Sequence, residues 1–246
     1  MSRTLFISDL HLDKARPEHL EALRAFLDHT ARDAEALYVL GDLFEAWIGD
    51  DDDDAFNRAV IEAFRHWSDD NGALYFMHGN RDFLLGEHFA AEAGGRLIPE
   101  GTVVNLYGRP TLLMHGDSLC TADEKYQQFR AMVRTEQWQQ ELLSKPLEER
   151  RAIAADMRRQ SQQDNANKAG NIMDVTPGEV VKAMENAGVH DLIHGHTHRP
   201  AVHDIALGAG AGKRWVLGDW GDNVWYLQAD STGNQLVDYP VTPASQ

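Results

Sequence analysis

Short apolar runs that end in glycine or polar residues recur along the chain and predict the strands of an α/β fold. Thr4 to Ser8, Leu37 to Leu40 and Ala73 to Met77 are such runs. Strands buried on both faces first tolerate charge at their carboxyl ends, where open α/β sheets place their sites. Pro17 opens a pattern of helical period between the first two runs, so the chain is predicted to begin as a βαβ unit.

The pattern changes in the second half of the chain. Between Asp123 and Asp174 the strand signals stop, and long helical stretches broken near Pro146 replace them. We therefore predict one domain over residues 1–246, with a helical unit inserted at residues 123–174. The other predicted elements are helices at Phe56–Trp67, Leu84–Ala93 and Pro177–Ala187, a hairpin of Val103–Leu106 and Thr111–Met114, and strands at Asp191–Ile193, Trp215–Leu217, Val224–Leu227 and Leu236–Val237.

Length, cysteine content and hydropathy indicate the protein's stability and its cellular compartment. At 246 residues the chain can bury a sizeable core without covalent staples. Its single cysteine, Cys120, excludes an intrachain disulfide and fits a reducing compartment. We find neither a signal-peptide pattern nor an apolar stretch of membrane-spanning length, so we expect a cytosolic or peripheral protein.

The charge is acidic and unevenly distributed. The formal net charge of −16 argues against a general nucleic-acid surface, which needs clustered lysine and arginine. Residues 124–168 carry nine basic and seven acidic side chains, net +2, so the remainder carries −18. The five acids at Asp50–Asp54 are interpreted as a solvated loop and helix N-terminus, not as a metal site.

Metal-ligand side chains follow five predicted strand ends. Asp9 and His11 lie two residues apart, which puts both on one face. Asp42 alone could equally be a helix N-cap, but five such ends in one chain are unlikely to arise by chance. Seven oxygen and nitrogen ligands exceed the needs of one ion and suit Mn, Fe or Zn better than Ca or Mg. The candidate ligands are Asp9, His11, Asp42, Asn80, His115, His196 and His198.

The other histidines are given a structural interpretation. His19, His29, His66 and His88 lie in helix or loop contexts and are predicted to be surface residues. His194 belongs to the Gly-His-Thr-His segment, but strand alternation turns it the other way, so its role stays open.

These motifs resemble the signature of the calcineurin-like metallophosphoesterases, and they spread over most of the chain. The segments are Asp9-x-His11, Gly41-Asp42, Gly79-Asn80-Arg81-Asp82, His115 and Gly195-His196-x-His198. The resemblance implies an α/β fold of two packed mixed sheets flanked by helices, with a pair of Mn²⁺ ions. By position, Asp9, His11, Asp42 and His198 resemble the ligands of one ion, and Asp42, Asn80, His115 and His196 those of the other, with Asp42 bridging.

Longer strings resemble one branch of that superfamily. They run from Gly41 to Asp51, from His78 to Gly86 and from His194 to Pro200. This resemblance implies hydrolysis of the pyrophosphate bond of UDP-2,3-diacylglucosamine to lipid X and UMP in lipid A biosynthesis. It also implies peripheral association with the cytoplasmic face of the inner membrane, and no obligate protein partner is evident. The implied substrate contacts are Asn80, Arg81, Asp123, Ser161, Asn165, Lys168 and His196.

Arg81 is where the chain departs from the superfamily, which usually has histidine there. Arginine cannot deliver a proton at neutral pH, whereas it can hold a phosphate oxygen. A departing phosphate needs no proton, so we favour an anhydride substrate and assign catalytic roles to Arg81 and Asp42. The structural alternative for Arg81 is an ion pair with Asp82.

The helical unit is interpreted as a substrate cap that attracts a pyrophosphate and an anionic membrane surface. Tyr126, Phe129 and Val133 could shelter acyl chains or simply pack against the body. Two rival functions remain at this point. One is a soluble nucleotide pyrophosphatase, and the other is a non-catalytic scaffold that keeps the fold.

Overall fold

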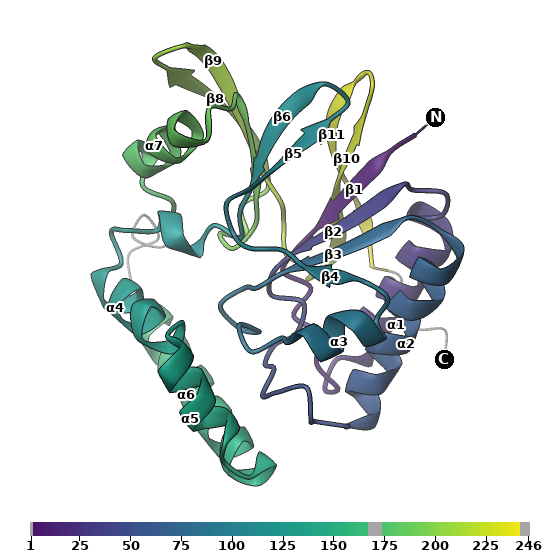
Figure 1. Cartoon of the computed structure of the whole chain (residues 1–246), viewed down its shortest axis with the longest axis vertical. Coiled ribbons are helices and arrows are strands. Elements are labelled where there is room, and N and C mark those ends of the chain that lie inside the picture. Colours follow the sequence, from purple (N-terminus) through teal and green to yellow (C-terminus); the bar gives the residue numbers. More distant parts are fainter. Residues whose placement is uncertain (1, 167–173, 242–246) are drawn as a thin grey trace.

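The computed structural model describes residues 2–166 and 174–241, which form two mixed β-sheets packed face to face (Figure 1). In the first sheet β1 to β4 are parallel and β10 and β11 antiparallel, in the order β11 (Gly233–Pro240), β10 (Asn223–Asp230), β1 (Thr4–Ile7), β2 (Ala36–Leu40), β3 (Ala73–Met77) and β4 (Arg96–Leu97). In the second, β6, β7 and β9 are parallel, in the order β5 (Thr102–Leu106), β6 (Arg109–Leu113), β7 (Asp191–His194), β9 (Gly210–Val216) and β8 (Ala201–Leu207).

Alternation along the strands produces a four-layer sandwich. In β1, Leu5 and Ile7 face one apolar cluster with the helices, while Phe6 joins the cluster between the sheets. A third cluster packs the outer face of the second sheet against α7. The helices, with one π and one 3₁₀ segment, are α1 (Pro17–Ala25), η1 (Phe26–Thr30), α2 (Ala55–Asp70), α3 (Glu87–Glu92), η2 (Asp117–Leu119), α4 (Glu124–Val133), α5 (Glu136–Leu143), α6 (Leu147–Ala166) and α7 (Pro177–Ala187).

The predicted α/β sandwich of two mixed sheets is confirmed, with two strands that the sequence pattern missed. β4 has only two residues, and β8 is an edge strand in which no residue is buried. Neither carries the apolar run that the prediction relied on. The strand predicted at Trp215–Leu217 overlaps the end of β9, which runs from Gly210 to Val216.

Two residues of the acidic run Asp50–Asp54 bind backbone N–H groups at the starts of helices. Asp54 caps α2, which confirms the predicted helix start. Asp50 accepts two backbone N–H groups at the start of α3, each at 2.9 Å, so it is not a solvated loop residue. The surface prediction was also wrong for His19, which is 4% exposed.

Helices α4, α5 and α6 project from the two sheets as an elongated arm (Figure 1). Pro146 lies between α5 and α6, where the sequence predicted a break. No helix within residues 2–166 and 174–241 has the length and apolar character to cross a bilayer.

Arginines of this arm pair with groups of the body. They are Arg130 with Asp117 and Glu100, Arg134 with the Gly79 carbonyl, Arg150 with Asp51 and the Ile48 carbonyl, Arg151 with Asp52, and Arg158 with Glu45 and Asp13. Much of the basic charge on the arm therefore neutralises the acidic body and holds the arm against it.

Candidate metal centre and substrate cavity

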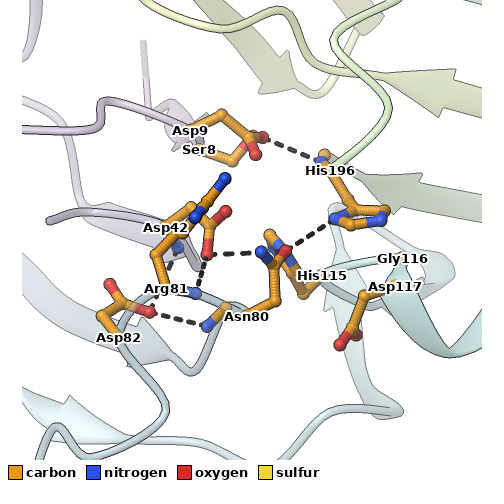
Figure 2. Close-up of polar contacts among 12 residues, drawn as sticks. Ser8, Asp9, Asp42, Asn80, Arg81, Asp82, His115, Gly116, Asp117 and His196 are labelled. Atoms are coloured by element: carbon orange, nitrogen blue, oxygen red, sulfur yellow. Dashed lines mark hydrogen bonds and ion pairs between the residues drawn. The ribbon is translucent and has the colours of Figure 1, made fainter. Parts of the chain in front are cut away.

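The seven predicted ligands come together at one edge of the sandwich. Asp9 and His11 follow β1, Asp42 follows β2, and Asn80 follows β3. His115 follows β6, and His196 and His198 follow β7, so both sheets contribute. Figure 2 shows five of these side chains, those of Asp9, Asp42, Asn80, His115 and His196. Parallel strands that end at the same edge explain why residues far apart in sequence meet here.

Backbone strain marks the same loops. Five of the seven residues have left-handed φ values between 48° and 67°, a region that non-glycine residues rarely occupy. Hydrogen bonds between the loops hold this conformation, among them Asp9 N to Gly41 O and His11 N to Asp42 O, both at 3.0 Å. Strain that the surrounding structure maintains is typical of functional sites. The five are Asp9, His11, Asp42, His196 and His198.

Gly79 gives the site its close packing. A Cβ atom placed there would lie 2.0 Å from Asp42 Oδ1 and 2.2 Å from Asp42 N, so any side chain would displace the carboxylate. This explains why the Asn80 motif begins with glycine.

The first ligand group is Asp9, His11 and His198. Asp9 Oδ2 accepts hydrogen bonds from Ser8 Oγ at 2.5 Å and His196 N at 2.9 Å. Within the part of the chain that the structure describes, its Oδ1 is buried without a hydrogen-bond partner. His198 Nε2 lies 3.3 Å from that oxygen and 3.2 Å from His11 Nε2. An unsatisfied carboxylate oxygen facing two ring nitrogens fits a divalent cation.

The second ligand group is Asp42, His115 and His196, with Asn80 beside it. Asn80 Oδ1 lies 3.0 Å from His115 Nε2 and 2.7 Å from His196 Nδ1. The other ring nitrogen of His115 lies 2.8 Å from the Leu40 carbonyl, so Nδ1 carries the proton and Nε2 faces the group.

Asp42 lies between the two groups. Its Oδ1 is 3.7 Å from His115 Nε2, and its Oδ2 is 3.9 Å from His11 Nε2. Oδ1 also accepts the backbone N–H of Arg81 at 2.8 Å, which fixes the carboxylate (Figure 2). Each oxygen thus faces one group, the arrangement that a bridging ligand needs.

The charges of the site favour cations. Burial lowers the pKa of His196 to about 4, so its ring is neutral and can offer a lone pair. Burial alone would lower the pKa of His115 too, but Asp42, Asp9 and Asp117 together raise it to about 9. Carboxylates that hold a proton on a buried ring would hold a metal ion in its place, with release of the proton.

Asp82 holds together the two loops that carry Asp42 and Asn80. It is fully buried, and its two oxygens accept the backbone N–H groups of Gly79, Asp42 and Leu43 at 2.8, 3.2 and 2.7 Å. No ion pair joins it to Arg81 within the described parts of the chain, so that alternative was wrong. Figure 2 shows the Arg81 side chain turned toward Asp42, with Asp82 on the other side.

Replacing Asp82 by asparagine is expected to lower the free energy of unfolding by about 1–3 kcal/mol. The amide keeps one acceptor oxygen and turns a donor toward backbone N–H groups, so at least one buried donor loses its partner. Urea unfolding of the metal-depleted protein measures this, with the exposed Asp70→Asn change as control. A variant as stable as wild type would show that Asp82 does not hold these loops.

A cavity of about 610 Å³ opens over both ligand groups. Arg81 lines it, and the Arg81 Nε atom is buried without a hydrogen-bond partner among the described residues, as expected of a guanidinium that awaits an anion. The wall includes apolar side chains of the body and the arm. These are Trp47, Ile48, Phe83, Leu84, Phe129, Leu142 and Met157.

The structure describes most of the predicted substrate contacts. Asn80, Arg81, Asp123, Ser161 and His196 all line this cavity. Asp123 is also the N-cap of α4, where it accepts the N–H of Tyr126 at 3.1 Å. The sequence analysis did not predict this capping role. The side chain of Asn165 and the whole of Lys168 lie outside the described residues.

The sequence analysis left two roles open for three side chains of α4, which are contact with acyl chains and packing against the body. Val133 is buried in the body's core, which fits packing. Phe129 lines the cavity. Tyr126 also lines it, stacks on the His196 ring with centroids 6.0 Å apart, and donates to Asp117 at 2.6 Å.

His194 is buried and faces away from both ligand groups, as alternation predicted. Its Nε2 lies 3.5 Å from Nη1 of Arg214, which belongs to the neighbouring strand β9. Sequence reasoning also missed Glu45 and Arg158, which contact each other at 2.9 Å beside His11, because no pattern links a loop to a distant helix.

Comparison with known proteins agrees with this geometry. The model of the calcineurin-like phosphoesterase family matches residues 2–200. The UDP-2,3-diacylglucosamine hydrolase of Cellvibrio japonicus is 53% identical over 238 residues, covering 97% of this chain and 99% of that protein. The protein of the same name from Pseudomonas aeruginosa PAO1 is 48% identical over 237 residues, covering 96% and 99%. The chain therefore belongs to the calcineurin-like phosphoesterases and, within them, to the UDP-2,3-diacylglucosamine hydrolase family.

Proposed function

We propose that this protein hydrolyses the pyrophosphate bond of UDP-2,3-diacylglucosamine to 2,3-diacylglucosamine 1-phosphate and UMP. The observation that carries the proposal is the position of Asp42 between two ligand groups on the floor of a cavity with a mixed polar and apolar wall. The near full-length identity to hydrolases named for this substrate supports it.

The two ligand groups suit a pair of Mn²⁺ ions. Asp9, His11 and His198 would hold one ion, and His115, His196 and Asn80 the other, with Asp42 shared. When bound, two such ions polarise phosphoryl oxygens and lower the pKa of an attacking water. The mixed carboxylate, amide and imidazole set favours a borderline metal over Ca²⁺ or Mg²⁺.

Arg81 is assigned to the phosphate groups. Its guanidinium keeps its charge at neutral pH and can donate two hydrogen bonds to one phosphoryl group, offsetting charge that grows during bond cleavage. It cannot act as a general acid. A departing phosphate does not need one, so the residue fits cleavage of an anhydride.

The helical arm, α4 to α6, is assigned to the substrate as a cap, in line with the insertion predicted at residues 123–174. Asp123, Tyr126, Phe129, Arg158 and Ser161 line the cavity from this side. Apolar side chains beside the ligand groups would suit acyl chains next to a sugar nucleotide. This lining favours a lipid-linked substrate over a soluble nucleotide pyrophosphate, and the complete ligand set argues against a scaffold.

We place the protein at the cytoplasmic face of the inner membrane as a peripheral protein. A diacylated substrate must be taken from a bilayer, and Met132 and Leu143 on the arm are 50% and 40% exposed. Exposed apolar side chains next to a substrate cavity are suited to shallow contact with lipid.

The assay that tests the function measures UMP released by metal-depleted protein. We expect turnover of UDP-2,3-diacylglucosamine when Mn²⁺ is returned, less with Mg²⁺, Zn²⁺ or Ca²⁺, and little release from UDP-glucose. Equal turnover of both substrates would favour a soluble nucleotide pyrophosphatase. No turnover with any ion would favour a scaffold.

Lys168→Ala is expected to raise the KM for the lipid substrate while the bound ions stay unchanged, because a cap residue contributes to binding the substrate and not the metal. The Ser161→Ala, Asn165→Ala double variant should do the same. Lys182→Ala on the exposed face of α7 is the matched control. Unchanged KM and kcat in both cap variants would exclude Ser161, Asn165 and Lys168 as substrate contacts.

A further inference from the structure

Glu45 contacts both the first ligand group and the helical arm. Its Oε2 lies 2.9 Å from His11 Nδ1, and its Oε1 lies 2.9 Å from Arg158 Nη2. Glu45 sits on the loop after β2, shortly beyond Asp42, whereas Arg158 belongs to α6. One carboxylate therefore touches a candidate metal ligand with one oxygen and the cap with the other.

The two ring nitrogens of His11 have different surroundings. Nε2 faces Asp9 Oδ1 at 4.0 Å and Asp42 Oδ2 at 3.9 Å, where a cation would lie. Nδ1 faces Glu45 Oε2 at 2.9 Å, on the side of the ring away from Asp9 and Asp42. A carboxylate on the outer nitrogen keeps the proton there and leaves the Nε2 lone pair for a metal.

We propose that Glu45 is a positioning residue that couples ion binding at Asp9, His11 and His198 to the seating of α6 over the cavity. The inference rests on the proposed function, which assigns those three residues to an ion. His11, if it held an ion through Nε2, would keep Nδ1 turned toward Glu45, and Glu45 would then present its second oxygen to Arg158. Because such coupling is reciprocal, a seated α6 also strengthens the ion site.

Only a carboxylate can serve both contacts, because each contact needs an acceptor oxygen. Glutamine offers one acceptor and one donor group, so Glu45→Gln must give up either His11 or Arg158 without changing size. Asp13 supplies a matched control. Its Oδ2 lies 3.6 Å from Arg158 Nη1. No ion pair or hydrogen bond of the described residues joins Asp13 to the His11 side chain.

The test combines Mn²⁺ titration with hydrogen exchange of residues 147–161 in the full-length protein. We expect Mn²⁺ to slow exchange in this part of α6 in wild type and in Asp13→Asn. In Glu45→Gln, one of the two ions should bind ~10–100-fold more weakly, and saturating Mn²⁺ should no longer slow exchange in α6.

Two results would overturn the proposal. One is wild-type affinity for both ions in Glu45→Gln, and the other is equal protection of α6 by Mn²⁺ in that variant and in wild type. An Asp9→Ala variant separates this failure from failure of the ligand assignment. If Asp9→Ala still binds two ions, the assignment is wrong, whereas if it loses one, the result for Glu45 stands on its own.

Discussion

Asp42→Ala is expected to lose bound metal and to lower turnover of the lipid substrate by about 10³-fold or more. Each Asp42 oxygen faces a different ligand group, so removing the carboxylate weakens both at once. Metal ions supply several kcal/mol of charge stabilisation to phosphoryl transfer, and about 4 kcal/mol corresponds to that loss. Metal content by mass spectrometry and UMP release measure the two effects.

The fold should survive the change. Asp42 is 1% exposed, but its loop is also held by Asp82 and by backbone bonds to the loop after β1. Circular dichroism and thermal unfolding check this point, with the exposed Asp28→Ala variant as control. Two ions still bound per chain of folded Asp42→Ala would refute the bridging role.

Arg81→Ala is expected to reduce turnover by roughly 10²–10³-fold while the metal content stays that of wild type. The guanidinium lines the cavity, and its buried Nε has no hydrogen-bond partner in the described parts of the chain, so under our proposal it binds the substrate's phosphate and does not stabilise the fold. Loss of one donor that stabilises transition-state charge typically costs this much.

Two further substitutions separate phosphate binding from proton transfer. Arg81→Lys keeps a charge but loses the two-pronged donor, so it should restore only part of the activity. Arg81→His introduces a group that can deliver a proton. If that variant exceeded wild-type turnover, proton delivery to the leaving group would have to replace charge stabilisation as the explanation.

The strands and the site followed from one regularity of the sequence. Apolar runs such as Leu37 to Leu40 identify buried strands, and the polar residue that follows each run identifies the shared edge where the ends meet. β4 and β8 could not be found in this way because they lack a buried apolar run. Their place in the sheets is set by pairing with a neighbour strand.

Long-range polar partners were beyond the reach of the sequence pattern. Asp82 looked like a partner for its neighbour Arg81, but it accepts backbone N–H groups from the Asp42 loop instead. The contacts of Glu45 with His11 and Arg158 depend on how the arm folds back over the body. Tertiary packing decides such pairings, and residue spacing does not encode them.

The basic character of the arm was detected correctly but interpreted too narrowly. Its net charge suggested attraction to a pyrophosphate or a membrane. The structure pairs arginines such as Arg130, Arg150 and Arg151 with acids of the body. These pairs fix the arm beside the cavity, so only part of its charge is left to meet a substrate.

Anomalous diffraction from crystals soaked in Mn²⁺ tests the central claim most directly. The account predicts two peaks per chain, one beside Asp9, His11 and His198 and one beside His115, His196 and Asn80, with Asp42 in contact with both. A single peak, or two peaks that do not share Asp42, would contradict it.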